Sequence, residues 1–149
     1  MSWHLHAAFD VLGEPKAQPR ARAFVDKRTG KARVYDKGTA EGWKGQIALA
    51  ARPFLPAAPF DCPIRVAVLF RFPRPGRLRR KKDPDGSIPH TTKPDADNAA
   101  KAVLDALTDV GMWRDDALVS SLLTDKDYAP KGKAAGALIQ IFTYQEDQP

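Results

Sequence analysis

The sequence predicts a mixed α/β fold of the α+β kind, in which one β-sheet packs against two main helices. Three observations support this prediction. Residues 64–72 (IRVAVLFRF) are rich in β-branched and aromatic side chains, which is typical of a strand. Residues 97–110 repeat apolar side chains at helical spacing, and residues 137–144 alternate as a half-buried strand does. With 149 residues, the chain suits a single domain, which we place at residues 1–149.

The first half of the chain predicts one strand, a long connection and one helix. Residues 3–12 are mostly apolar and predict a first strand. Residues 13–38 combine prolines, glycines and many charges, so we expect a connection without regular structure. Thr39 suits a helix N-cap, and residues 40–52 follow as a helix that Pro53 ends.

The second half predicts the remaining elements. Residues 73–94 hold five prolines and two glycines and predict a loop. The helix at 97–110 is the most distinct in the chain, and Gly111 supplies its stop. Residues 117–123 predict a strand, with an extension to 128 left open, and a turn at 130–132 leads to the final strand.

Composition excludes several classes of protein. No stretch approaches the roughly 20 apolar residues of a membrane helix, and the first residues lack a signal peptide, so we expect a soluble cytoplasmic protein without a membrane partner. The single cysteine, Cys62, excludes an intrachain disulfide, and the three histidines lack zinc-ligand spacing. Motifs of serine hydrolases, P-loop and Rossmann proteins and zinc proteases are absent from the sequence.

The formal net charge is +6, and the charged residues are distributed unevenly along the chain. Basic residues dominate 13–44 and 71–82, whereas eight aspartates lie between 95 and 127. This pattern is expected if the basic segments bind phosphates and the acidic one binds metal ions, although solvated surface charge is an alternative. The candidate DNA-binding residues are Lys16, Arg20, Arg22, Lys27, Arg28, Arg74, Arg77, Arg79, Arg80, Lys81 and Lys82.

An Asp-x-Asp pair lies where the predicted loop meets the predicted helix. Pro94 disfavours helix at Lys93, so Asp95 is expected in extended backbone, and Asp97 should cap or open the helix. If residues 95–97 are extended, both carboxylates point the same way, and such oxygen donors suit Mg²⁺ or Mn²⁺. The alternative is structural, a cap and helix-dipole interaction worth about 0.5–2 kcal/mol.

Further charged residues lie close to this pair in the predicted fold. Lys101 follows Asp97 by four residues on the same side of the helix, where it could neutralise a phosphate or form an ordinary ion pair. Asp115 and Asp116 precede the next strand, which could bring one of them back to the helix start as a third carboxylate. Their alternative role is in a turn.

Four aromatic side chains have two readings. They could stack on nucleobases, but their helix and strand spacing favours the hydrophobic core. The residues are Trp43, Phe70, Phe72 and Trp113.

The segment KPDADNAAKAVLDAL, followed by GMWRDDALV at 111–119, resembles the signature of the RusA-type Holliday-junction resolvases. It places an Asp-x-Asp-Asn, a lysine, a helix aspartate and a downstream Asp-Asp in order and spacing. The resemblance is densest over residues 93–128. The early Gly-x-Pro and the basic residues of 13–22 are also similar to the family.

The resemblance implies a RusA-like fold and a homodimeric, Mg²⁺-dependent endodeoxyribonuclease that nicks four-way DNA junctions in recombination and repair. It implies that Asp95, Asp97 and Asp116 are catalytic metal ligands and that Lys101 is a catalytic lysine. Mn²⁺ is an alternative ion, and a prophage origin is expected. Two segments longer than in the shorter members, 17–37 and 76–90, should determine which branched DNA fits.

Two other functions remain open at this point. A non-catalytic module could recognise branched DNA through the same basic segments, with structural aspartates. A metal-dependent nuclease could instead act on flaps, forks or RNA.

Overall fold

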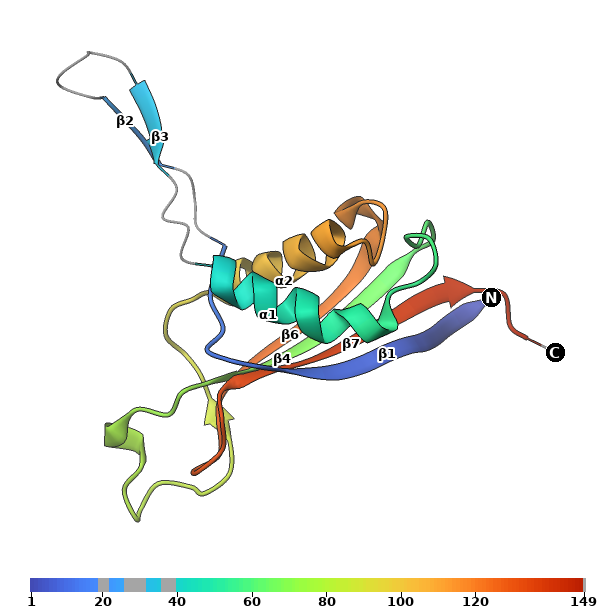
Figure 1. Ribbon diagram of the computed structural model, residues 1–149. Helices are drawn as coiled ribbons and strands as arrows, with labels where there is room; N and C mark the ends of the chain where they lie inside the picture. The colour runs from blue at the N-terminus through green and yellow to red at the C-terminus, as the bar shows by residue number, and fades with distance from the viewer. Residues whose placement is uncertain (19–21, 26–31, 36–39, 149) are drawn as a thin grey trace.

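The computed structural model describes residues 1–18, 22–25, 32–35 and 40–148. Among these, two α-helices cover one face of a five-stranded mixed sheet (Figure 1), which confirms the predicted fold class. The strand order is β1-β7-β4-β6-β5. The strands span Ser2–Leu12 (β1), Ile64–Phe72 (β4), Ile88–Pro89 (β5), Val119–Tyr128 (β6) and Gly136–Gln145 (β7).

A parallel crossover determines which ends of the elements meet. Strands β4 and β6 pair in parallel, from Ile64 opposite Val119 to Phe72 opposite Tyr128. Helix α2 (Ala96–Val110) forms part of the connection between them. Strand β1 runs in the same direction as β4, because both pair with β7 antiparallel. The C-terminal ends of β1, β4 and β6 therefore lie at one edge of the sheet, which we call the loop edge.

The core lies between the sheet and the helices. Residues of β4 are alternately buried and partly exposed, and the buried side chains include Val66 and Phe70. Helix α1 (Glu41–Ala51) contributes Trp43 and Ile47. The four aromatic residues discussed above are all buried at 4% exposure or less, which confirms that they belong to the core.

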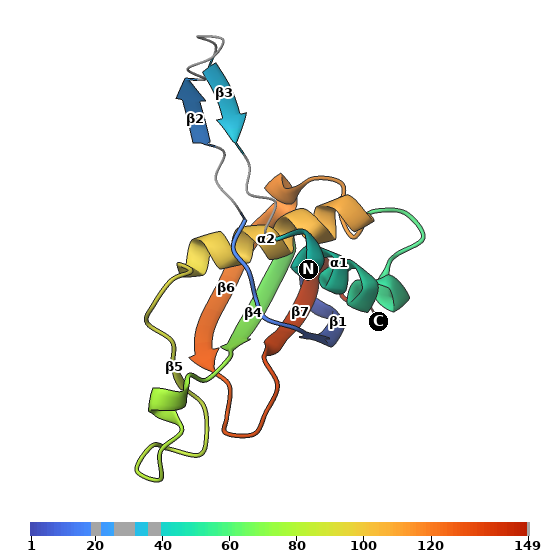
Figure 2. The same ribbon diagram turned by 60° about the vertical axis from the view of Figure 1, so that its left-hand side comes forward.

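Several boundaries differ from the sequence prediction. The expected irregular connection contains a hairpin, β2 (Arg22–Val25) with β3 (Ala32–Tyr35), which stands apart from the sheet in Figures 1 and 2. Local alternation over four residues was too short to reveal it among the charges. The N-cap of α1 is Ala40, and Thr39 lies outside the described residues.

Short 3₁₀ helices account for the other differences. They span Arg52–Phe54 (η1), Gly76–Leu78 (η2) and Asp116–Leu118 (η3). As a result, β6 begins at Val119 rather than at 117, and the predicted extension to Tyr128 is confirmed. None of the helices within the described residues is both long and apolar enough to span a bilayer.

Arg74 orders the basic loop, residues 73–87, through hydrogen bonds to backbone carbonyl oxygens. This side chain is only 4% exposed. Its guanidinium donates to the carbonyl oxygens of Ala129 (3.1 Å), Leu78 (3.2 Å), Pro84 (2.5 Å) and Gly86. Arg74 therefore links three points of the loop to the residue that follows β6.

Lys131 supports the same loop from the turn after β6. Its Nζ donates to the carbonyl oxygens of Arg80 (2.8 Å) and Asp83 (2.7 Å), and it forms an ion pair with Asp85 at 3.2 Å. Hydrogen bonds to charged donors are worth more than neutral ones. The loop therefore has an ordered backbone, although it contains little regular secondary structure.

Replacing Arg74 should open the basic loop. In Arg74→Met the carbonyl oxygens of the loop lose a buried cationic donor, and leaving such acceptors unpaired is costly. We expect trypsin to cut after Lys81 or Lys82 at least about tenfold faster than in the wild type. Arg79→Met is the control, because it removes the same charge from an exposed position in this loop. Equal cleavage rates in the two variants would contradict the role of Arg74.

Candidate active site

The loop edge gathers segments that are far apart in the sequence. After β1 the chain passes along the start of α2, where the Gln18 backbone N–H donates to the Asn98 carbonyl oxygen at 3.3 Å. After β6, the Ala129 N–H donates to the Phe72 carbonyl oxygen at 2.8 Å. The N-terminus of α2 and the basic loop lie at this same edge (Figure 2).

Asp95 and Asp97 lie at the N-terminus of α2, as the sequence predicted. However, α2 begins at Ala96, so the expectation that both carboxylates point the same way from one extended segment is wrong. Asp95 is the N-cap, with extended backbone at φ −64° and ψ 152°. Its carboxylate accepts hydrogen bonds from Lys93 Nζ at 2.8 and 3.0 Å. Asp97 is exposed in the first helical turn. The favourable end of the helix dipole therefore faces two carboxylates.

Lys126 holds the turn that carries Asp95. Its Nζ reaches from β6 to the carbonyl oxygens of Thr92 (2.9 Å) and Pro94 (2.7 Å). The His90 backbone N–H donates to the Lys126 carbonyl oxygen at 2.9 Å. The ion pair between Lys93 and Asp95 is largely exposed and therefore contributes little. The backbone contacts of Lys126 are the stronger constraint on the position of Asp95.

Lys101 lies one helical turn beyond Asp97, on the outside of α2. Its Nζ is 3.8 Å from Asp105 Oδ1, an i,i+4 pair, and the lysine side chain is 59% exposed. At that separation and exposure the pair restrains Lys101 only weakly. Its ammonium group is therefore accessible to an anion approaching the helix.

Asp115 and Asp116 lie at the opposite end of α2. Helix α2 has 15 residues and spans about 22 Å, and the chain then turns back through η3 into β6. The expectation that β6 would return these residues to the helix start is therefore wrong within one chain. In a parallel crossover the second strand begins where the helix ends, and it reaches the loop edge only at Lys126 and Tyr128.

The local contacts of the two aspartates differ. Asp115 caps η3, and its Oδ1 accepts a hydrogen bond from the Ala117 backbone N–H at 2.8 Å. This bond, together with one to Asp116 and the nearby Arg114 cation, lowers the pKa of Asp115. Asp115 therefore has a structural role in its turn. Asp116 is exposed beside it.

The chemistry of the carboxylates is compatible with a metal site, but the geometry within one chain does not complete one. Carboxylate oxygens are suitable ligands for Mg²⁺ or Mn²⁺. However, nowhere in residues 1–18, 22–25, 32–35 and 40–148 do three or more His, Cys, Asp or Glu side chains form a group that could hold a metal ion. One chain alone therefore supplies only Asp95 and Asp97 as candidate metal ligands at this edge.

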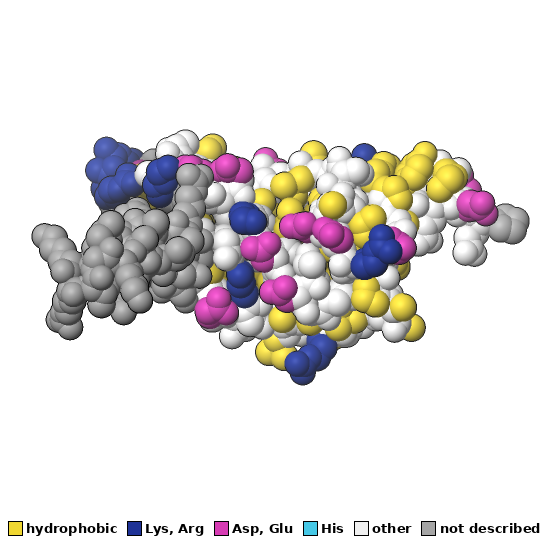
Figure 3. Space-filling view, turned by 90° about the horizontal axis from the view of Figure 1, so that it is seen from above, with side chains coloured by type: hydrophobic (Ala, Val, Ile, Leu, Met, Phe, Trp, Pro, Cys, Tyr) yellow, Lys and Arg dark blue, Asp and Glu magenta, His cyan; other side chains and the backbone are white. Residues whose placement is uncertain are grey.

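The predicted phosphate-binding residues fall into three groups. Lys16 and the basic-loop residues Arg77, Arg79, Arg80, Lys81 and Lys82 are exposed. Figure 3 shows Lys and Arg side chains at the end of the molecule that carries the basic loop, and acidic ones along the middle of the helical face. Arg74 is buried on carbonyl oxygens, so its position fits loop ordering. Arg20, Lys27 and Arg28 lie outside the described residues, as does the side chain of Arg22.

A hollow beside Asp95 was not predicted from the sequence. It measures about 360 Å³ and is lined by residues that include Phe72, His90, Thr92 and Lys93. His90 is 7% exposed, and both its burial and the nearby Lys126 cation lower its pKa. The role of Lys126 was not predicted either. The sequence feature that could have pointed to it is a single lysine between two aspartates, Asp125 and Asp127, in a strand.

Comparisons with known proteins show the family of the chain. The family model "Endodeoxyribonuclease RusA" matches residues 13–141. "Uncharacterized protein YqaN" of Bacillus subtilis (strain 168) is 33% identical over 126 residues, which cover 81% of this chain and 87% of that protein. The matched region includes the C-terminal ends of β4 and β6, helix α2 and the Asp115–Asp116 turn. The chain therefore belongs to the RusA endodeoxyribonuclease family.

Proposed function

We propose that this protein is a Mg²⁺-dependent endonuclease that resolves four-way DNA junctions by paired nicks in recombination and repair. The observation that carries the proposal is the position of Asp95 and Asp97 at the start of α2, next to a turn whose carbonyl oxygens Lys126 binds. Exposed cations lie nearby, and the family model matches this region. Mn²⁺ is the alternative ion. The cytoplasmic location and the prophage origin of this protein remain predictions from its sequence.

The proposed roles follow from where the side chains lie. Asp95 and Asp97 would hold the ion, which when bound supplies an activated water and offsets charge on the phosphate. Lys101 adds an exposed positive charge one turn along α2 and would face the DNA backbone. Lys126 keeps Asp95 in place through the backbone and is a positioning residue.

Asp116 enters the site through a second copy of the chain. Because the crossover separates Asp116 from Asp95 in one chain, we place the partner's Asp116 beside Asp95 and Asp97 in a homodimer. A two-fold dimer has two such composite sites, which matches the two nicks that resolve a symmetric junction. The basic loop and Lys16 would bind the flanking backbone, so affinity should fall steeply with salt.

Replacing Asp97 should abolish nicking without abolishing binding. We expect Asp97→Asn to lower the nicking rate of a labelled four-way junction in Mg²⁺ by at least about 100-fold, because a ligand charge is lost. Asp109→Asn, an exposed aspartate at the other end of α2, should nick as the wild type does.

The same assay separates the alternatives. Junction binding without nicks in Mg²⁺ or Mn²⁺ would favour the non-catalytic DNA-binding module. Faster cutting of flaps, forks or RNA than of four-way junctions would favour a nuclease with another substrate. Unchanged nicking by Asp97→Asn would refute the proposed mechanism.

Mixing two inactive variants tests the composite site. Asp97→Asn and Asp116→Asn should each be inactive, but their heterodimer contains one site with every wild-type carboxylate. After random subunit exchange, we expect roughly a quarter of the wild-type nicking activity, with single rather than paired nicks. If each site came from one chain, the mixture would stay inactive. A sedimentation measurement on each variant checks that dimers form.

A further inference from the structure

The hollow beside Asp95 has no role in the proposed reaction. Its walls come from Glu14–Ala17 after β1, from the end of β4, from the prolines and Arg77 of the basic loop, and from His90, Thr92, Lys93 and Pro94. Its volume is about 360 Å³, near the small end of the roughly 300–1,000 Å³ typical of ligand sites. Lys93 and Pro94 in its wall directly precede Asp95. Any occupant is therefore held next to the proposed site of cleavage.

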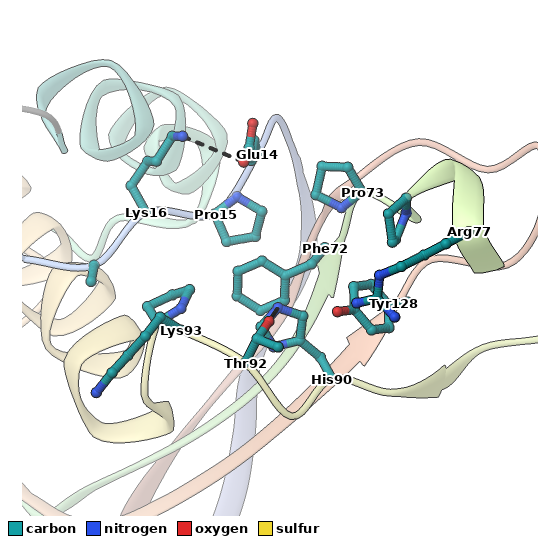
Figure 4. A pocket seen from close by; sticks show the side chains of 13 residues that line it. Glu14, Pro15, Lys16, Phe72, Pro73, Arg77, His90, Thr92, Lys93 and Tyr128 are labelled. Atoms are coloured by element: carbon teal, nitrogen blue, oxygen red, sulfur yellow. Dashed lines mark hydrogen bonds and ion pairs between the residues drawn. The ribbon is translucent and has the colours of Figure 1, made fainter.

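The floor of the hollow is aromatic. Phe72 and His90 stack with ring centroids 4.0 Å apart and an angle of 18° between their planes. Tyr128 meets His90 edge-on at 4.8 Å. Pro15, Pro73 and Pro94 contribute further apolar surface, and Figure 4 shows Phe72 among these side chains. These rings are mostly buried, with Phe72 4% and His90 7% exposed, so they give the hollow an apolar floor, which suits a flat ligand.

The rim is basic. Lys16 and Lys93 lie on one side of the hollow and Arg77 on the other (Figure 4). Glu14 also lines the rim and is paired with Lys16 at 3.4 Å, while Lys93 contacts Asp95. The rim thus has three cations and one anion. An apolar interior below such a rim is complementary to an aromatic base with phosphates on either side.

We propose that this hollow takes one nucleobase, displaced from the DNA stack, from the strand whose phosphate lies at Asp95 and Asp97. The proposal rests on the proposed function and adds to it how a branch point is recognised. A base leaves its stack at lowest cost where pairing is already disturbed, as at the centre of a junction. Regular duplex DNA would keep its bases stacked and leave the hollow empty.

The test uses 2-aminopurine, a base analogue whose fluorescence rises when it unstacks. It is placed in turn at each position around the junction centre, and binding is followed without divalent metal. We expect the wild type to raise the fluorescence at least threefold at one position next to the nicked phosphate. Substitution of that position in a duplex of the same sequence should give no rise.

Two substitutions fill the hollow from two different segments of its wall. Thr92→Phe and Ala17→Phe each place a ring in it, and both should abolish the fluorescence rise while junction affinity changes less than threefold. Thr91→Phe is the matched control, because Thr91 is the exposed neighbour of Thr92 and does not line the hollow. Circular dichroism confirms that the variants fold. Two different sites are used because Thr92 also hydrogen-bonds His90 Nε2 at 3.2 Å.

The outcomes separate this proposal from the proposed function. Nicking by the wild type with no position-specific fluorescence rise would overturn the base-binding hollow and leave the nuclease intact. A rise that persists in both filled variants would also overturn it. A rise that only the filled variants lose, without nicking in any metal, would support the hollow and favour the DNA-binding module.

Discussion

The parallel pairing of β4 with β6 is the constraint on which the rest of the structure depends. Two parallel neighbours need a connection that returns along the sheet, and α2 provides it. The start of the helix therefore lies beside the C-terminal ends of both strands. The same geometry sends Asp115 and Asp116 to the far end. One topological requirement thus places Asp95 and Asp97 at the loop edge and separates them from Asp115 and Asp116.

Arg74 and Lys126 are among the cations of this protein that bind its own backbone. Arg74 donates to carbonyl oxygens of the basic loop, and Lys126 donates to those of the turn before Asp95. In both cases a charged donor satisfies acceptors in segments that lack regular secondary structure. The neighbouring exposed lysines and arginines then project from an ordered backbone. Net charge alone does not distinguish these two roles.

The sequence was most informative where a pattern is local. The strand at 64–72, the helix opening at Asp95 and the stop at Gly111 follow from spacing, β-branching and cap chemistry, and the structure confirms them. The hairpin from Arg22 to Tyr35 was missed because its strands have four residues each. Local patterns do not report how far apart the two ends of a helix lie. The separation of Asp95 from Asp116 therefore required the topology.

Local sequence patterns also could not predict the internal cations or the hollow. Arg74 belongs to a run of basic residues, and only its carbonyl partners identify it as buried. His90 meets Phe72 and Tyr128 because three strand ends and a loop converge. These contacts join residues up to 55 positions apart in the sequence, and no short motif encodes them.

The prior order of the basic loop has a kinetic consequence. A segment that folds only on contact with DNA loses conformational entropy at that moment and shows a large negative heat-capacity change. Arg74 and Lys131 already fix this backbone in the free protein. In the proposed DNA complex, this loop would therefore meet DNA as a preformed basic surface, and long-range electrostatic attraction would speed the association.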